Sequence, residues 1–527
     1  MKKAPKTLAA LVALVLVASM LLTACGSSPS APAASDGQQT APAGEPAAVK
    51  DSAVIAIAAE PSTLGSWLCN DLTSKGVANN LYDTLIRLES DGTLNPGLAT
   101  EWTYNDDHTE ITFTLREGVK FHNGDTMTAD DVVFSINTAI ENAGTTKRIT
   151  GSFDRMEKID DTHVILYLNI PYGAVENCLT SENCGIVSKA AYEADPDGFS
   201  RNPVGTGPYK LQSWDAGEKI VFAANEDYWR EPAALKTVTF KFVNDSTAAL
   251  VALETGDIDA LDGPSTADYS YIQDKDGLTL STAFLTQGWH VVFNMNEGHP
   301  FADENLRKAV ALAVNKEDFV IGAMDGHASV SQGAIPANCV GAPADFHGYE
   351  QDIEAAKEAL AASSYNGETI KVTLMSSGYY PKMGETLKEC LRQIGLNVEL
   401  DMQERATAIE SINSSTFDLG CWSWSALIAD ADQSAYVRFH SSCLGYGNNF
   451  IGVNDPAIDA ALDAGRFGKT LEEREAAYLE FENLVKENYY IVPLLLPEYA
   501  IAYNSNLQGV TATAVKRIYL YDWSWSC

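Results

Sequence analysis

The sequence lacks the short motifs that mark the common hydrolases and metal enzymes. Its 9 cysteines form no C-x-x-C pair, which argues against zinc-ribbon and thioredoxin-type sites. Its 8 histidines form no H-E-x-x-H pattern, and no G-x-S-x-G segment occurs. A partial P-loop match lacks its first glycine, because Asp463 stands there, and Gly468-Lys469-Thr470 instead predicts the start of a helix. These absences favour a binding protein over an enzyme.

Basic residues are also scarce. The chain has 36 Lys and Arg against 71 Asp and Glu, a formal net charge of −35. Such an excess of negative charge argues against a nucleic-acid partner and against direct adsorption to anionic lipid. The acidity is explained by solubility and does not by itself identify a cationic ligand. After the N-terminal region, the strongest apolar run, residues 492–497, is far too short to span a membrane.

The N-terminus has the pattern of an export signal. Three lysines within the first six residues precede the apolar run Leu8–Leu22, which has the length of a signal-peptide core. Leu22-Thr23-Ala24-Cys25 follows and resembles the bacterial lipobox. The resemblance implies that residues 1–24 are removed as a signal peptide and that Cys25 becomes a lipidated N-terminus. Two acyl chains and an acylated amine would be a stable anchor, so we expect a protein held on the outer side of the cell membrane.

Residues 25–50 are predicted to form the lipidated cysteine and a flexible tether. Residues 26–50 contain Gly, Ser, Pro, Ala, Gln and acidic residues and no aromatic residue. Such a composition buries too little apolar surface to offset the entropy lost on ordering. The tether would hold a folded module near the membrane without fixing its orientation.

The other cysteines are spread thinly along the chain. Cys178 and Cys184 are close in sequence and would be able to pair in an oxidising exterior. They are equally suited to be reduced core residues, and the sequence leaves both alternatives open.

Helical and strand patterns alternate through the rest of the chain. Such alternation predicts α/β lobes with mainly parallel sheets. Strands are expected at residues 52–59, 112–116, 370–375 and 398–402, and helices at residues 355–362, at 383–394 and from Thr128, a plausible N-cap with acidic residues in the first turn.

Several long motifs resemble one family of transport proteins. Residues 94–102 read L-x-P-x-L-A-x-x-W, and residues 113–135 read F-x-L-R-x-G-V-K-F-H-x-G-x-x-x-T-A-x-D-V-x-F-S. Further matches occur in the expected order at Asn202–Tyr209, Asn225–Trp229, Leu253–Asp259 and Phe293–Val310. Together they resemble the family 5 extracellular solute-binding proteins, which serve oligopeptide, dipeptide and nickel ABC importers. The resemblance covers residues 52 to about 505, and its motifs are mostly turns, caps and core contacts.

The resemblance implies an α/β fold of the periplasmic-binding-protein type (cluster C), with two large lobes joined by a hinge and a smaller inserted lobe. Lobe I is expected at residues 51–88, 200–285 and 496–527, the inserted lobe at 89–199 and lobe II at 286–495. A monomer would capture a small solute or oligopeptide between the large lobes by hinge closure. It would then deliver the solute to a permease and ATPase. A surface receptor or chaperone-like binding protein that is not coupled to transport is the alternative.

The expected cleft strand departs from the family's short-peptide pattern. Residues 417–422 resemble the family's second-lobe strand and imply that Trp422 faces the cleft. Ser425 stands where peptide binders carry the Asp that pairs with a peptide amino terminus, with Asp430 and Asp432 as candidate substitutes. Residues 375–381 lack the Arg that dipeptide binders use for the carboxylate. A buried zwitterion needs a partner at each end, so short peptides are disfavoured, while longer peptides held by their backbone remain compatible.

Aromatic and hydroxyl side chains occupy this region in place of the charges, and they suit a sugar, an aromatic compound or a cationic amine. The remaining candidate ligand residues are Trp424, Tyr379, Tyr380, Trp289 and Trp67. Core packing is the open alternative for each tryptophan. We expect stacking on Trp422 to matter more than a salt bridge to the amino terminus. No cofactor or metal is predicted, and His440 is the one second-lobe histidine near this strand that we considered for nickel.

Overall fold

The computed structural model describes residues 50–90 and 92–526. The described residues form one compact unit. The predicted signal peptide, Cys25 and nearly all of the tether lie outside the described residues. Within the described part, no helix is both long enough and apolar enough to cross a membrane.

One large sheet dominates the molecule. Its path of strands is β16 (Val398–Gln403), β15 (Ile370–Met375), β17 (Leu419–Ser425), β13 (Gln287–Phe293), β18 (Ile491–Asn504), β11 (Ala260–Asp262), β1 (Ser52–Ile57), β10 (Thr237–Phe242), β9 (Lys219–Ala224) and β8 (Tyr209–Asp215), and β12 (Leu278–Phe284) and β14 (Ala328–Val330) pair with β18 off this path. The smaller sheets are β4 (Ala99–Tyr104), β5 (Glu110–Leu115), β7 (His163–Leu168) and β6 (Phe153–Lys158), then β2 (Ile86–Leu88) with β3 (Leu94–Pro96), and β19 (Leu507–Gln508) with β20 (Ser524–Trp525).

Helices cover these sheets. They are α1 (Leu72–Ala78), α2 (Ala129–Glu141), α3 (Thr145–Thr150), α4 (Val175–Cys178), α5 (Lys189–Ala194), α6 (Ser246–Thr255), α7 (Tyr269–Asp274), α8 (Glu304–Ala313), α9 (Lys316–Met324), α10 (Ile353–Ala362), α11 (Tyr380–Ile394), α12 (Arg405–Asn413), α13 (Ala431–Phe439), α14 (Pro456–Phe467) and α15 (Leu471–Glu487). The expected strands and helices listed above all overlap these elements, and β15 has the predicted bounds.

The expectation of mainly parallel sheets is wrong. Among the described strands, parallel pairs join β1 to β10 and β11, and β15 to β16 and β17. The other pairs are antiparallel, as in β8–β9–β10 and in every pair that β18 makes. The short connection between β8 and β9 makes that pair antiparallel, because a parallel pair needs a long crossover.

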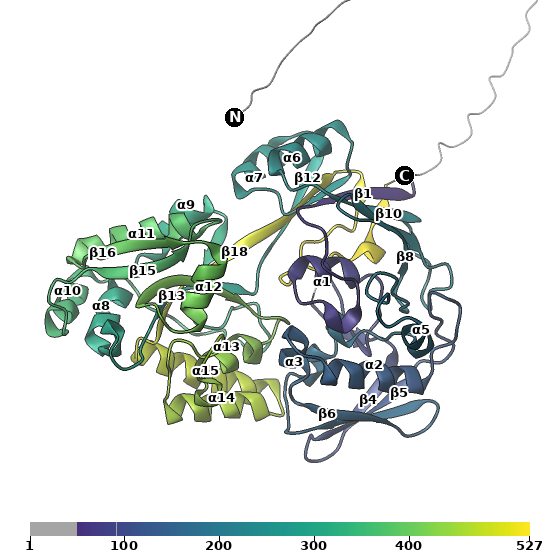
Figure 1. Cartoon of the computed structure of the whole chain (residues 1–527), viewed down its shortest axis with the longest axis horizontal. Helices are drawn as coiled ribbons and strands as arrows, with labels where there is room; N and C mark the ends of the chain where they lie inside the picture. Colours follow the sequence, from purple (N-terminus) through teal and green to yellow (C-terminus); the bar gives the residue numbers. More distant parts are fainter. Residues whose placement is uncertain (1–49, 91, 527) are drawn as a thin grey trace, which may run out of the picture. The chain divides into compact units, whose positions relative to one another are not determined.

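Strand β18 belongs to both halves of the large sheet. Its first part pairs with β13 through residues 491–495, and its second part pairs with β12 through residues 498–504. In Figure 1 this yellow strand runs from the region of β13 to the region of β12 and β1. A single continuous strand therefore links the two halves.

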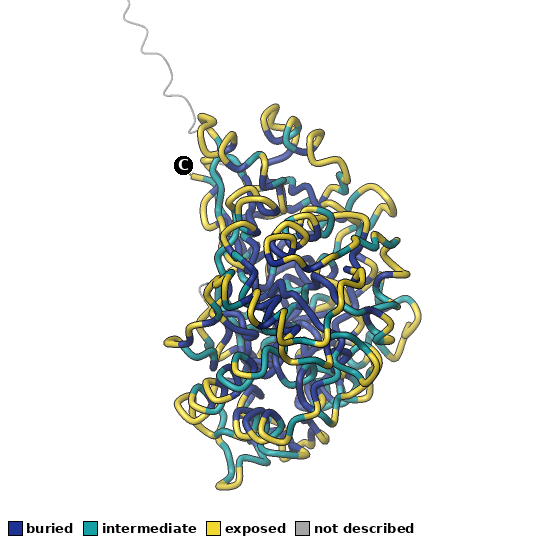
Figure 2. The backbone as a smooth tube through the Cα atoms, turned by 90° about the vertical axis from the view of Figure 1, so that its left-hand side faces the viewer, coloured by how far each residue is buried: buried dark blue, intermediate teal, exposed yellow. Residues whose placement is uncertain are grey.

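Three bodies pack around separate cores. We call lobe I the body whose core lies mainly in residues 53–82, 199–285 and 499–523. The inserted lobe has its core mainly in residues 85–186, and lobe II has two clusters mainly within residues 289–495. The buried backbone, dark blue in Figure 2, runs through the interior. The boundaries drawn from the sequence remain predictions.

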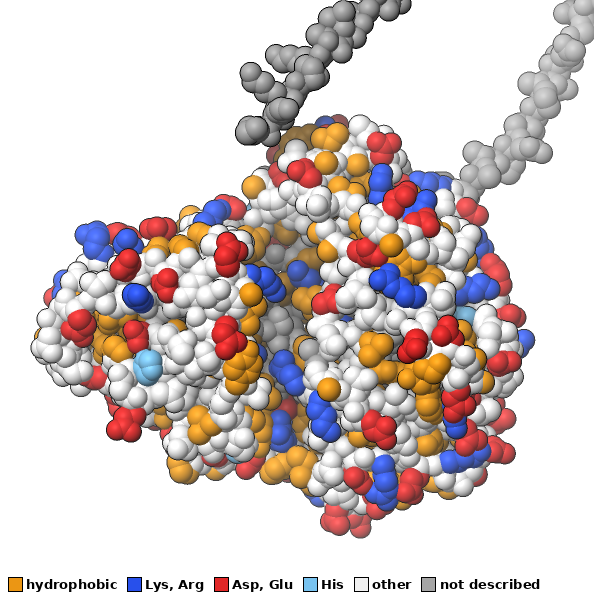
Figure 3. All heavy atoms as spheres, in the orientation of Figure 1, with side chains coloured by type: hydrophobic (Ala, Val, Ile, Leu, Met, Phe, Trp, Pro, Cys, Tyr) orange, Lys and Arg blue, Asp and Glu red, His pale blue; other side chains and the backbone are white. Residues whose placement is uncertain are grey.

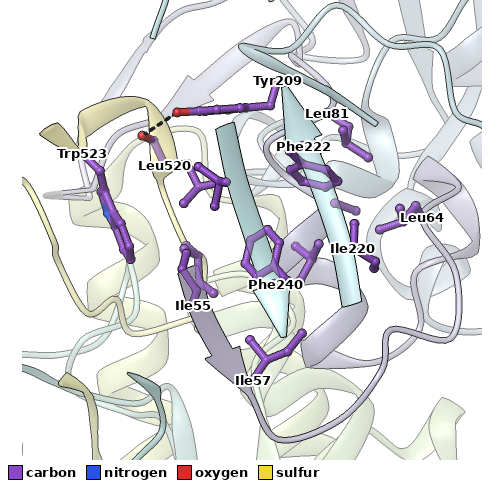
Figure 4. Packing of buried hydrophobic residues seen from close by; sticks show 14 of the residues in the cluster. Ile55, Ile57, Leu64, Leu81, Tyr209, Ile220, Phe222, Phe240, Leu520 and Trp523 are labelled. Atoms are coloured by element: carbon purple, nitrogen blue, oxygen red, sulfur yellow. Dashed lines mark hydrogen bonds between the residues drawn. The ribbon is translucent and has the colours of Figure 1, made fainter. Parts of the chain in front are cut away.

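Lobe I is closed by the C-terminal segment. Figure 4 shows Ile55, Phe222 and Phe240 from adjacent strands packed together, with Trp523 and Leu520 on one side. The Tyr209 hydroxyl donates a hydrogen bond to the Leu520 carbonyl at 3.4 Å. Residues far apart in sequence thus share one apolar core, which supplies most of the stability of such a lobe.

Local signals in the sequence have clear structural causes. Thr128 caps α2 and Thr470 caps α15, each in a reciprocal capping box, as the sequence predicted for both helix starts. The glycine-rich turn approaches the chain at Leu81 so closely that a Cβ at Gly207 would lie 2.5 Å from the Leu81 carbonyl carbon. Cys178 and Cys184 are buried free thiols, so they are core residues rather than a disulfide.

Candidate ligand-binding site

A cavity of about 400 Å³ lies where the three bodies meet. Its walls come from residues within segments 79–92, 228–230 and 512–522, from 177–182 of the inserted lobe, and from 338–340 and 427–429 of lobe II. This volume falls in the range of small-molecule sites. Figure 3 shows this face of the molecule hollowed, with lysine and arginine side chains gathered along the hollow. A second pocket, at residues 122–123 and 201–216, has no lobe II residue in its lining.

One side of the cavity, the polar wall, carries charged and aromatic side chains. Its members used below are Asp83, Arg87, Glu89, Arg230, Tyr521 and Asp522. Arg87 is hydrogen-bonded to Glu89, so these two charges balance. The guanidinium carbon of Arg230 lies 4.3 Å from the centre of the Tyr521 ring, a cation–π contact. Arg230 forms no ion pair with any described carboxylate, so its positive charge is available to a ligand.

Asp83 is held at the cavity by a family motif. Tyr228 and Trp229, the last residues of the N-x-x-Y-W segment, donate hydrogen bonds to its carboxylate at 2.9 and 2.8 Å. Asn225 fixes the turn by bonding the Gly207 carbonyl at 3.1 Å. Burial raises the pKa of Asp83 to about 6, although these donors oppose the shift. A carboxyl that titrates near neutral pH therefore faces the site.

Glu182 anchors the inserted lobe to lobe I beneath the cavity. Its side chain is 1% exposed and meets Lys75 and Arg517 at 2.7 Å each. Burial alone would raise its pKa, but the charges of Arg517 and Lys75 outweigh burial and lower the pKa below its usual value. Both of these cations already pair with the Glu182 carboxylate, so we assign it a structural role and not a ligand-binding one.

A second part of the lining, the apolar wall, comes from lobe II. It contains Val340, Leu427, Ile428 and Ala429. The last three follow β17 after Ala426, so this strand carries the chain into the cavity. A lining of apolar side chains with a few charged groups is the usual composition of a solute site.

The predicted tryptophans lie elsewhere in lobe II and in lobe I. Trp422 and Trp289 both contact Tyr380, with ring centres 5.4 and 4.7 Å apart, and they are 8% and 3% exposed. Trp424 stacks on His290 at 4.1 Å. Trp67 packs against Tyr192 at 5.4 Å, inside lobe I. These placements favour core packing, which the sequence left open for each ring.

The remaining candidates are dispersed. Tyr379 is 36% exposed and precedes α11, and Ser425 is half-buried opposite Gln287 in the sheet. His440 is buried and stacks on Tyr436 at 4.3 Å. Among the described residues, no group of three His, Cys, Asp or Glu is arranged to hold a metal ion. All nine predicted ligand residues are described, and none lines the cavity.

Asp430 and Asp432 are occupied by arginines. Asp430 is 0% exposed and bonds Arg474 at 2.5 and 3.1 Å. Asp432 is 1% exposed and bonds Arg466 at 2.8 and 2.9 Å. An incoming amine would have to displace an arginine to reach either carboxylate.

The same carboxylates join lobe II to the inserted lobe. The Asn177 amide donates to Asp430 at 3.0 Å, and the Tyr172 hydroxyl donates to Asp432 at 2.9 Å. The Gly173 N–H also donates to the Arg466 carbonyl at 2.9 Å. We call this contact the seam. Asn177 also lines the cavity, so the seam borders the site.

The sequence contained one overlooked signal for the cavity. The N-x-x-Y-W segment is interpreted from the sequence as structural. Its Tyr228 nevertheless lines the cavity, and so does Arg230, the residue that follows the segment. No local pattern marks residues 512–522, which reach the site only through the fold.

Comparison with known proteins places the chain in a family. Residues 93–445 match the model of the bacterial extracellular solute-binding proteins, family 5 (middle region). The chain therefore belongs to the family 5 extracellular solute-binding proteins. The sequence-based family assignment and the mixed α/β binding-protein fold are confirmed.

Individual relatives resemble the chain over most of its length. It is 29% identical to Protein XP55 of Streptomyces lividans, over 82% of this chain and 81% of that protein. It is 26% identical to the oligopeptide-binding protein AppA of Bacillus subtilis, over 99% of both chains. The solved structure of DppA from Helicobacter pylori, in complex with the peptide STSA, is 25% identical with a TM-score of 0.77, covering 91% of this chain and 99% of that one.

The buried Asp430–Arg474 pair yields a stability prediction. Asp430→Ala leaves the Arg474 guanidinium, 4% exposed, without its carboxylate, and the free energy of unfolding should fall by about 3–5 kcal/mol. Urea denaturation measures this change.

Two further variants complete the test. Glu389→Ala breaks the exposed pair with Arg392 and should change the free energy of unfolding by less than about 1 kcal/mol. Adding Arg474→Met to Asp430→Ala should restore most of the loss, because no buried charge then lacks a partner. A loss in Asp430→Ala no larger than in Glu389→Ala would contradict the assignment.

Proposed function

We propose that this protein captures a small solute or peptide in the cavity between lobe I, the inserted lobe and lobe II, and delivers it to an ABC permease. The observation that carries the proposal is the cavity itself, because residues of lobe I, the inserted lobe and lobe II all contribute to its lining. A solute that contacts both walls favours the arrangement in which the lobes are close. The family consists of extracellular binding proteins, and we propose a binding rather than a catalytic role.

Hinge closure is the proposed conformational step. The link supporting it is β18, which pairs with β13 at one end and β12 at the other. Closure around a ligand needs a few residues between the lobes that absorb the change in dihedral angles. Residues 495–498, where β18 passes from β13 and β14 to β12, are the proposed hinge in that strand.

The ligand chemistry follows from the polar wall. Arg230 offers a positive charge over an aromatic ring, and Asp522 and Asp83 offer carboxyl groups. The relatives AppA and H. pylori DppA are described as binding peptides, and a peptide carries matching groups at its two ends. We therefore propose a peptide or a similar polar solute. Stacking on Trp422 stays a prediction, and Tyr521 supplies a ring within the cavity itself.

Export and anchoring form the second part of the proposal. The lipobox at residues 22–25 and the polar stretch behind it support a lipoprotein tethered at Cys25 on the outer side of the cell membrane. We propose that the protein acts there as a monomer beside its permease and ATPase.

Blocking the cavity tests the binding proposal. Val340 is 40% exposed on the apolar wall, so Val340→Trp adds a large ring to the cavity without disturbing the core. The purified variant should retain less than about a tenth of the co-purifying solute, measured by mass spectrometry of a denatured extract. Ile321→Trp is the matched control, because Ile321 is 70% exposed on α9 and does not line the cavity. Equal retention in both variants would place the ligand elsewhere.

The anchor has its own test. Cys25→Ser removes the acylated side chain, so the protein should move from the membrane fraction to the soluble fraction of the expressing cells. Fractionation followed by immunoblotting measures this shift. Unchanged membrane partitioning of a processed chain would show that Cys25 is not the anchor.

A further inference from the structure

Two of the four arginines considered near the seam have no carboxylate partner. The other two, Arg466 and Arg474, each form two hydrogen bonds with an aspartate. Arg148 on α3 and Arg438 on α13 form no ion pair with any residue that the structure describes. The contrast is sharp in a chain with 71 acidic residues.

Arg438 has no carboxylate partner among the described residues. One of its terminal nitrogens, Nη1, donates to the Gly447 carbonyl at 2.8 Å, and its guanidinium carbon lies 5.6 Å from the centre of the Trp424 ring. Its Nε is buried without a hydrogen-bond partner. Burial, and then the charge of Arg148, lower the pKa of Arg438 to about 9. Arg438 is half-buried, and a partly desolvated cation without a counter-charge is unfavourable, so the site favours an anion.

Arg148 approaches from the inserted lobe. Its Nη2 donates to the Gln433 carbonyl at 3.5 Å, and the Gln433 amide donates back to the Arg148 carbonyl at 3.1 Å. Its Nε is also buried without a partner. The charge of Asp432 acts on Arg148, but both Asp432 oxygens are bonded to Arg466. The inserted lobe and lobe II therefore each place an arginine at α13, and the charge of Arg148 acts on Arg438.

The adjoining aromatic residues add a donor and no negative charge. The Trp424 indole N–H is buried without a partner, and the side chain is 5% exposed. His290 stacks on this ring and is 0% exposed, with both ring nitrogens unpaired. Burial, together with the charges of Arg438 and Lys316, lowers the pKa of His290 to about 3, so it is neutral. The neighbourhood thus holds several unpaired ring and guanidinium nitrogens, while the nearby Asp432 carboxylate is already bonded to Arg466.

We propose that Arg148 and Arg438 form an oxyanion-binding site that bridges the inserted lobe and lobe II. A planar carboxylate or a tetrahedral oxyanion matches the forked donors of guanidinium groups. The anion holds the two lobes together, because it gains bonds from both only when they are adjacent. The site stands apart from the cavity function, and it rests on the proposed function only where the anion is the carboxylate of a captured solute.

Anomalous diffraction locates the anion without any substitution. Crystals of the full folded module are soaked in sodium selenate, and the selenium signal is mapped. The expected result is a peak within hydrogen-bond distance of both the Arg148 and the Arg438 guanidinium. A map with no peak between these two side chains overturns the proposal.

Solution measurements test the role of each arginine. Sodium acetate replaces sodium chloride at constant ionic strength, and the thermal unfolding midpoint is recorded. The midpoint of the natural protein should rise with acetate, and Arg148→Gln and Arg438→Gln should need at least about tenfold more acetate for the same rise. Arg392→Gln, which alters an exposed arginine paired with Glu389, should behave as the natural protein does. Identical responses in all four proteins overturn the proposal, and the selenate map decides if a variant does not fold.

Competition identifies the source of the anion. Tetra-alanine with a free carboxylate should displace selenate, whereas tetra-alanine amide should not, if the occupant is the end of a captured solute. If neither tetra-alanine nor its amide displaces selenate, while selenate and acetate still bind, the occupant of the site is a free inorganic oxyanion. If the natural protein binds selenate at the two arginines but holds no solute in the cavity, the proposed function is refuted and this site still stands.

Discussion

The rest of the structure depends on the continuity of β18. Residues 491–504 pair with strands in both halves of one sheet, so β18 connects lobe I and lobe II directly. Pro493 and Pro497 lie within it and donate no backbone hydrogen bond. The pairing with β13 shifts its register between Trp289 and His290, opposite Pro493. The strand is continuous, but its ladder with β13 is irregular close to the place where β18 passes from β13 and β14 to β12.

Charge pairing organises the seam, which borders the cavity at Asn177. Asp430 and Asp432 are buried, and each is matched by an arginine and by a hydrogen bond from the inserted lobe. Buried pairs of this kind add little net stability, but they are costly to break, so they fix which surfaces meet. The seam therefore sets the arrangement of lobe II and the inserted lobe, while the cavity beside it stays open to a solute.

Local features were predictable from the sequence, and distant ones were not. The caps at Thr128 and Thr470 and the turn at Gly207 depend on neighbouring residues or on backbone shape, so sequence patterns revealed them. The parallel-sheet prediction failed because alternating helices and strands do not determine the direction in which β18 runs. The arginines that occupy Asp430 and Asp432 lie 44 and 34 residues away in sequence, beyond any motif.

The candidate site shows the same division. Trp422 lies on the strand that leads to the cavity, but its ring packs with Tyr380, because alternation along β17 directs it toward the lobe II core. Along this stretch of the chain, the first residue that lines the cavity is Leu427, which comes after Ser425, the last residue of β17 predicted to contact the ligand. Its polar wall gathers residues from three separate stretches of the chain. The polar wall therefore forms only when the C-terminal segment packs onto the rest of lobe I.

A crystal structure of the protein purified with its natural solute tests the central claim most directly. The account predicts density for the solute in the cavity of about 400 Å³, in contact with Arg230 or Tyr521 on one side and with Val340 or Ile428 on the other. Solute density outside this cavity, for example against the rings of Trp422 and Tyr380, would contradict it.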